Sequence, residues 1–250
     1  MRKSVTPAVR TRMTPELLGT NAILSALEPQ LRVTVCDRAE LVDLAVRDPI
    51  YQPNEPIGEV FFPFDCVLSI VTRMKDGNSI EIGTVGREGC SGIPLILGAT
   101  TTANESYCQV AGLAVKMDAD FFQELRQDQE FDRTLDRFVQ AYVNMLGQHA
   151  ACNRLHSVYE RAARWLLMTK DRVGRNDIGL THEYLAMMLG TQRSGVTIAA
   201  GTLQQAGFIR YARGVITILD PEGLEGASCE CYEIAREQFG GLMRSTEAHF

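Results

Sequence analysis

The 250-residue sequence predicts an α+β fold with three parts: a jelly-roll-like β-roll, a long helix, and two short helices followed by a β-hairpin. Three observations predict this fold. Short apolar runs punctuated by glycine and proline extend from about residue 32 to 116, as in a rolled antiparallel sheet. After Asp118 the apolar period becomes helical. In the last third, two helical patterns meet at a glycine and precede two strand patterns.

The composition is typical of a globular protein, with 45% hydrophobic and 22% charged residues. No apolar run approaches the length of about 18 residues that a membrane span needs. The first residues carry basic side chains but no apolar stretch behind them, unlike a secretory signal. Seven scattered cysteines without an export signal indicate reduced thiols. We therefore expect a cytoplasmic protein with no membrane partner.

Strand signals dominate the N-terminal half. The runs 67–74 and 79–85 flank Lys-Asp-Gly-Asn, which is typical of a hairpin. Further strands are expected at 59–64, 106–112 and 113–117, and a helix with Pro15 in its first turn is expected over 14–27. These signals predict an N-terminal extension with a helix at 1–29 and a β-roll at 30–127.

The helical segment begins with a short helix at about 119–128, followed by a longer one from about 131 to 155. Six positions of the longer helix form a heptad stripe: Leu135, Phe138, Tyr142, Met145, His149 and Cys152. A second stripe follows Val139, Val143, Leu146 and Ala150. Two stripes indicate two partners, so we expect this helix, assigned to 128–156, to pair with a second copy through the six heptad residues. A helix buried wholly within one chain is the alternative.

The next region, 157–232, predicts a winged helix-turn-helix. An amphipathic helix over 157–173 ends at Gly-Arg-Asn-Asp. Thr181 is placed to cap a helix over 182–189, Gly190 to form the turn and Thr191 to cap the second helix. Val196 then faces back onto the first helix, a spacing typical of helix-turn-helix units. Two strands around Ala-Arg-Gly form the wing, and 233–250 is left as a C-terminal tail.

These features resemble the Crp/Fnr-type bacterial transcription regulators over about residues 30–225. The family pattern L-T-x-E-x-L-A-x-x-L-G-x-x-R-x-x-V is matched at Leu180, Thr181, Glu183, Leu185, Ala186, Leu189, Gly190, Arg193 and Val196. The resemblance implies a cyclic nucleotide-binding-like β-roll sensor, a dimerisation helix and a DNA-binding domain, in this order. It also implies a homodimer that binds a palindromic site in double-stranded DNA, with RNA polymerase as a further partner.

The start of the second helix favours DNA binding, because free N–H groups and the helix dipole attract phosphate. The predicted DNA-binding residues are Thr191, Gln192, Arg193, Ser194, Thr197, Arg210 and Arg213. Between Ser157 and Asp220, eight basic against five acidic residues leave a charge of +3, so the remainder carries −9. Gly195 is expected to let the helix approach the groove closely, and Gly201 to pack against the wing.

Two departures from the family pattern limit what the resemblance implies. Where the family often has a glutamate and a second basic residue, this chain has Ser194 and Ile198, so the usual DNA half-site is not carried over. Ile198 either contacts a thymine methyl or packs inward.

The sensor end also departs from the family, in which a Gly-Glu-Leu-like turn and a later arginine hold the cyclic nucleotide phosphate. Here Gly92 precedes Ile93 and Pro94, and Glu105 lies near the place of the cation. A buried phosphate without a cation is unfavourable, so we expect neither cyclic AMP nor cyclic GMP to bind in the usual way. The ligand pocket is assigned to these four residues, with the effector unidentified.

Other chemistries have weaker signals. The four histidines, at 149, 156, 182 and 249, lie outside the β-roll, so a cupin-like metalloenzyme is not expected, and no catalytic residues are assigned. The cysteines at 36, 66, 90 and 108 are too scattered for an iron–sulfur cluster.

One helical face carries His149, Cys152 and His156, which could ligate a metal or haem, or bring Cys152 to its twin in a dimer as a redox sensor. Alternatively, they are polar and small residues of the helix seam. Cys229-Glu-Cys231 is too short to indicate a metal site alone, so no metal is assigned. The alternative function is a small-molecule-binding regulatory protein whose helical domain docks a protein partner.

Overall fold

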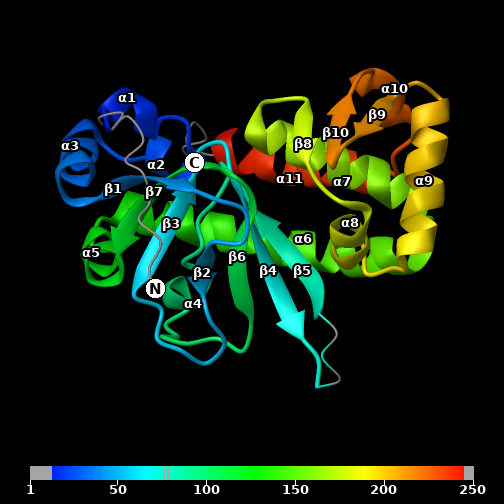
Figure 1. Cartoon of the computed structure of the whole chain (residues 1–250). Helices are drawn as coiled ribbons and strands as arrows, with labels where there is room; N and C mark the ends of the chain where they lie inside the picture. Colours follow the sequence, from blue (N-terminus) through cyan, green and yellow to red (C-terminus); the bar gives the residue numbers. More distant parts are fainter. Residues whose placement is uncertain (1–12, 76, 78, 245–250) are drawn as a thin grey trace.

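The computed structural model describes residues 13–75, 77 and 79–244, and its α+β architecture confirms the predicted fold class. A β-roll and a helix-turn-helix domain lie side by side, and the long helix α6 runs behind both in the view of Figure 1. The turn residues Asp76 and Asn78 and the end of the expected tail, 245–250, lie outside the described residues. In the part that is described, no helix is both long and apolar enough to cross a membrane.

The N-terminal segment forms three helices where one was expected. Helices α1 (Pro15–Leu18) and α2 (Ala22–Ser25) are separated at Asn21, whose side-chain oxygen accepts hydrogen bonds from the Ile23 and Leu24 N–H groups. Helix α3 (Pro29–Arg38) occupies a stretch assigned to the β-roll. It buries only Val35 fully, so it has almost no apolar periodicity to reveal it.

The β-roll consists of two antiparallel sheets. The first has the strand order β1 (Glu40–Leu44), β7 (Gly112–Asp118), β3 (Glu59–Pro63). The second has the order β2 (Pro49–Tyr51), β6 (Glu105–Val110), β4 (Val67–Arg73), β5 (Ser79–Val85). Two short helices, α4 (Ile93–Ile96) and α5 (Ala119–Leu125), complete this unit. All five expected strands are present, and β1 and β2 are additional.

Helix α6 (Gln129–Leu155) packs its heptad stripe onto the β-roll of its own chain. The side chains of Leu135, Phe138, Tyr142 and Met145 are at most 4% exposed. A Cβ atom at Gly83 would collide with Tyr142, and one at Gly89 with Phe138. Cys152 is likewise buried, and His149 is partly buried. This placement corrects the assignment of the stripe to a dimer interface, because its side chains already fill the core of one chain.

The C-terminal third is the winged helix-turn-helix that the sequence predicts. Its elements are α7 (Val158–Val173), β8 (Asp177–Gly179), α8 (His182–Met188), α9 (Arg193–Gln205), β9 (Ile209–Ala212), β10 (Val215–Ile218) and α10 (Pro221–Gly226). The wing sheet has the order β8-β10-β9, with β8 as an unexpected third strand. Leu185, Val196 and Leu203 are buried at the centre of this domain.

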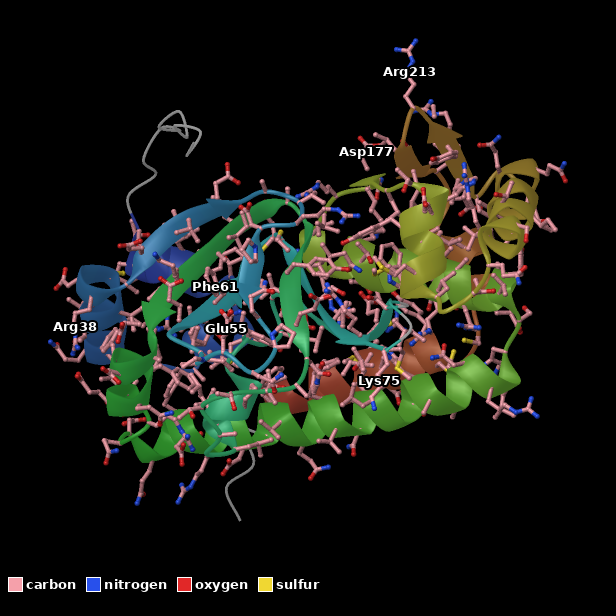
Figure 2. All side chains as sticks on the ribbon, turned by 60° about the horizontal axis from the view of Figure 1, so that its bottom comes forward. Arg38, Glu55, Phe61, Lys75, Asp177 and Arg213 are labelled. Carbon is pink, nitrogen blue, oxygen red and sulfur yellow. The ribbon has the colours of Figure 1, made fainter. Side chains whose placement is uncertain are left out.

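The segment expected as a tail is instead helix α11 (Cys231–Arg244). It packs along α6 and contacts α7, so the chain returns to the long helix after completing the wing (Figure 2). Tyr232 and Ala235 are buried in this contact, and Phe239 packs against the β-roll core. The apolar positions of α11 lie among charged residues, so no continuous apolar run marks this helix in the sequence.

Gly89→Ala is expected to lower the free energy of unfolding by about 1–3 kcal/mol, because the added methyl group would collide with the Phe138 ring inside a packed core. Denaturant unfolding followed by circular dichroism measures this loss. Gly58→Ala is the control, since no atom lies within 4 Å of the added Cβ. Equal stabilities of the two variants would contradict the tight contact between α6 and the β-roll.

Candidate nucleic-acid interface

The turn between α8 and α9 is held by backbone geometry. Thr181 caps α8 as expected, its Oγ1 accepting a hydrogen bond from the Tyr184 N–H at 3.1 Å. Gly190 adopts a φ of +56°, which favours glycine. The Thr191 N–H donates to the Ala186 carbonyl at 3.0 Å, and Arg161 donates to the Leu189 carbonyl. These bonds orient the start of α9.

The N-cap of α9 is Gln192 rather than the expected Thr191, and no side-chain hydrogen bond caps this end among the described residues. A side-chain cap would occupy N–H groups of the first helical turn. The Gly195 N–H donates to the Gln192 carbonyl at 3.0 Å, while the N–H groups of Arg193 and Ser194 carry no side-chain cap, and the helix dipole favours an anionic acceptor there. The correction to the cap therefore strengthens the case for an anion at this end.

Helix α9 has one buried and one exposed face. Its buried residues are Val196, Ala199, Ala200 and Leu203. Its exposed face begins at Gln192 and includes Arg193, Ser194, Thr197, Ile198 and Gly201. Helix α9 lies at the edge of the molecule, on the far side from the β-roll (Figure 1). The predicted DNA-binding residues of this helix thus lie together, with Thr191 half-buried beside them.

The structure determines the orientation of Ile198 and corrects the packing role expected of Gly201. Ile198 is 71% exposed, so it points outward rather than into the core. Nothing lies within 4 Å of a Cβ atom added at Gly201, so this glycine is not required for packing against the wing. Gly195 also has room for a Cβ, at 3.6 Å from Thr191 Oγ1. Both glycines are therefore compatible with a surface that another molecule approaches closely.

A chain of contacts connects both helices to the wing. His182 Nδ1 lies 3.2 Å from Thr197 Oγ1, and the His182 ring stacks on Tyr211 with ring centroids 4.3 Å apart. Burial, and then the positive charge of Arg193, lower the pKa of His182. The sequence does not indicate that His182 and Tyr211 connect α8 to the wing, because the two residues belong to separate elements.

The wing turns at Arg213 and Gly214, with φ values of 51° and 77°. Two successive residues with positive φ match a type I′ hairpin turn. Arg213 projects from the tip into solvent (Figure 2), and Arg210 is exposed on β9. Gln204 Oε1 accepts a hydrogen bond from the Tyr211 N–H at 2.8 Å, which connects α9 to the wing.

The basic residues of this domain divide into a buried group and an exposed group. Arg161, Arg164 and Arg172 are at most 7% exposed and lie inside the molecule. Arg175 binds the Ala111 carbonyl at 2.7 Å, in the β-roll. Only part of the local charge of +3 therefore faces outward near α9, where the exposed arginines are Arg193, Arg210 and Arg213. Charge counted along the sequence overestimates what phosphate would meet.

The helix-turn-helix domain contacts the second sheet of the β-roll. Tyr184 of α8 packs on Tyr107 of β6 with ring centroids 6.3 Å apart. Beside them Glu81 of β5 is enclosed, its carboxylate accepting hydrogen bonds from Ser69 at 2.6 Å and Trp165 at 3.3 Å. Burial raises the pKa of Glu81 to about 7. A titratable group thus lies between the two domains.

His149 lies near this contact, where burial, then Arg164 and Arg172, lower its pKa to about 3. Its neighbours include Glu81 and Trp165, and it does not belong to the cluster that contains Cys152 and His156, with which it was grouped from the sequence. Cys152 faces Cys229 inside the same chain, with 3.6 Å between the sulfurs, so it does not face a twin across a dimer. Both placements correct the interpretation of the shared helical face.

The expected ligand pocket is not assembled as one site. Glu105 lines a cavity of about 280 Å³ whose other residues include Arg47, Arg73 and Tyr107. Gly92, Ile93 and Pro94 are absent from its lining and lie at the start of α4. Arg73 pairs with Glu105 at 2.9 Å, so the cation near this glutamate comes from strand β4. That neither cyclic AMP nor cyclic GMP binds in the usual way stays a prediction.

Comparison with known proteins extends these observations. Residues 160–227 match the Crp-like helix-turn-helix domain. A protein from Eubacterium rectale described as a transcriptional regulator of the Crp/Fnr family is 17% identical, with a TM-score of 0.63 over 84% of this chain and 98% of its own. FixK2 from Bradyrhizobium japonicum is 14% identical, with a TM-score of 0.65 over 76% and 98%. TTHB099 from Thermus thermophilus is 18% identical, with a TM-score of 0.63 over 76% and 99%. No curated protein sequence matches the chain.

The fold and the α9 surface define a β-roll protein with a winged helix-turn-helix domain. The chain has the fold of the Crp/Fnr-type transcription regulators, and residues 160–227 form a Crp-like helix-turn-helix domain.

Glu81→Gln is expected to remove one component of the pH dependence of stability. Because the folded state raises the pKa of Glu81 from 4.5 to about 7, the folded chain holds this proton more tightly than the unfolded chain. The contribution of Glu81 to stability therefore falls as pH rises from about 4.5 to 7. Relative to the wild type, the variant should gain up to about 3 kcal/mol over this range.

Urea unfolding at several pH values measures the difference between Glu81→Gln and the wild type. His149 titrates in both proteins and so cancels in the comparison. Glu59→Gln is the control, because this glutamate is 49% exposed and pairs with Lys116. A stability difference that does not change with pH would show that Glu81 is not held in a desolvated contact.

Proposed function

We propose that this chain is a homodimeric, sequence-specific transcription regulator that places helix α9 of each protomer in the major groove of a palindromic DNA site. The observation that carries the proposal is the exposed face of α9. No side-chain hydrogen bond caps the N-terminus of this helix, Arg193 lies at its start, and Arg210 and Arg213 are exposed on the neighbouring wing. An exposed helix of this kind fits the major groove, with its N-terminal residues toward the base edges.

The proposed contacts divide by position. Arg193 and Gln192 lie at the N-terminal end of α9, where they would reach base edges, and Ile198 would meet an apolar group such as a thymine methyl. Arg210 and Arg213 lie on the wing, where they would neutralise backbone phosphates. Gly201 has no side chain on the exposed face of α9, so the helix backbone there can approach the groove wall closely.

A dimer would form through the outer side of α6, because the inner stripe is filled by its own chain. Of the second stripe, Val139 and Leu146 pack partly against the β-roll core, whereas Val143 is 53% exposed on this outer side. Gly147 and Ala150 follow at helical spacing and are exposed, and nothing lies within 4 Å of a Cβ added at Gly147. Small residues on an exposed helical face permit close approach of a second helix.

The controlling signal would act through the contact between the β-roll and α8. Glu81, Tyr107 and Tyr184 lie in this contact, so a change in the β-roll would alter the position of the helix-turn-helix domain. RNA polymerase remains a proposed partner, and the effector remains unidentified.

Selection from random duplexes followed by titration tests DNA recognition. The wild type should enrich a palindrome, and its affinity should fall steeply with salt. Arg213→Ala is expected to lower the slope of log affinity against log salt by about 2, because the dimer loses two phosphate contacts. Arg193→Ala should lose about 1–3 kcal/mol of discrimination per half-site.

Arg133→Ala is the matched control, because this arginine is exposed on α6, on a different element from the proposed DNA surface. A domain that ignores duplex DNA at low salt would contradict the proposal and favour docking of a protein partner. Loss of binding in Arg133→Ala to the same degree would show that general charge, and not the α9 surface, governs affinity.

Val143→Glu is expected to convert a dimer into a monomer, because it would place two carboxylates in an apolar contact between the α6 helices. Sedimentation velocity at micromolar concentration measures the mass. Val33→Glu, at an exposed valine of α3, should leave the dimer intact. A wild-type monomer, or a Val143→Glu dimer, would place the interface elsewhere.

A further inference from the structure

Four side chains with metal-binding atoms meet where α6 ends and α11 begins. Cys152 and His156 come from the last turn and cap of α6, while Cys229 precedes α11 and Cys231 is its first residue. Their sulfur and ring-nitrogen atoms all lie within 4.8 Å of one another. The three cysteines are buried and the histidine is half-buried. Two segments more than seventy residues apart thus supply one compact ligand set.

The distances fit one tetrahedral ion. Cys152 Sγ lies 3.6 Å from Cys229 Sγ, and Cys231 Sγ lies 3.5 Å from His156 Nδ1. With metal–sulfur bonds of about 2.3 Å and metal–nitrogen bonds of about 2.0–2.1 Å, a tetrahedral zinc site separates two sulfurs by about 3.8 Å and sulfur from nitrogen by about 3.6 Å. The sulfurs of a disulfide would instead be about 2.0 Å apart.

The surrounding groups orient the ligands. His156 directs Nδ1 toward Cys231, while its other ring nitrogen, Nε2, lies 3.2 Å from the Glu230 carboxylate. A carboxylate that accepts from the distal ring nitrogen selects the tautomer that can bind a metal. Gln148 Nε2 donates to Cys231 Sγ at 3.0 Å, a contact that stabilises a thiolate. Supporting contacts of this kind are characteristic of metal sites.

The charge balance also suits a metal–thiolate centre. One divalent ion with three thiolates and a neutral imidazole carries a net charge of −1. Arg161 interacts electrostatically with Cys152 and Cys229, and Arg164 interacts with Cys152. Both arginines are buried, so they compensate this charge where water does not. Three sulfurs and one nitrogen in a closed tetrahedral set favour zinc in a structural role.

We propose that Cys152, His156, Cys229 and Cys231 bind one zinc ion per chain, which fastens both ends of the helix-turn-helix domain to the end of α6. His156 caps α6 and Ser157 caps α7, so the ion lies at the junction through which the chain enters the domain. Cys229 and Cys231 lie where the chain leaves it. The bound ion restricts movement of the domain about this junction. This proposal does not rest on DNA binding.

The test uses the full chain purified without chelator. Elemental analysis of the wild type should give one zinc per chain, and cobalt substitution should give thiolate-to-cobalt charge-transfer bands of a tetrahedral site. Cys229→Ser and His156→Ala should reduce the zinc content from about one to near zero. Cys36→Ser, at a half-buried cysteine outside the cluster, is the matched control and should keep the full amount.

X-ray absorption at the zinc edge of the wild type keeps the test independent of whether any variant folds. Three sulfur neighbours and one nitrogen neighbour are expected. Each of four results would overturn the proposal: wild type without stoichiometric zinc after exposure to it, zinc bound only by nitrogen and oxygen, full zinc content in Cys229→Ser, or a stoichiometric metal that is iron.

Discussion

The close packing of α6 against the β-roll is the contact on which the rest of the structure depends. Tyr142 and Phe138 fill space that exists only because Gly83 and Gly89 carry no side chain. Burial of large apolar side chains at this density makes a large contribution to stability. The same helix provides a surface for α11 and leads into α7, so its position determines where the helix-turn-helix domain lies. A shift of α6 on the sheet would therefore move every element that follows it.

The contact between the β-roll and α8 is of a different kind. Its centre is polar: the Glu81 carboxylate is removed from water but receives hydrogen bonds from Ser69, Gln109 and Trp165. A buried carboxylate contributes little net stability even when it is well bonded, because its desolvation offsets its interactions. The helix-turn-helix domain is therefore connected to the β-roll in two ways, through the apolar packing of α6 and through this polar contact.

Patterns between neighbouring residues predicted most of the fold and the α9 surface, because strand alternation, the Gly190 turn and the amphipathic faces are local. The failures share a cause. The sequence shows that α6 has two apolar stripes but not which one faces the sheet, and Arg161 and Arg172 look like DNA-facing charges until the fold buries them. Glu105 meets Arg73 across strands, and Cys152 meets Cys229 across an entire domain. Such contacts depend on the chain topology, which a local sequence pattern does not predict.

The proximity of Cys152 to Cys229 also bears on how such proteins diversify. Residues 157–228 leave the body of the molecule and return to it at nearly the same point. A segment whose ends are adjacent can be replaced by another of different length without displacing the scaffold. Recombination at this junction would join the same β-roll to a different helix-turn-helix domain.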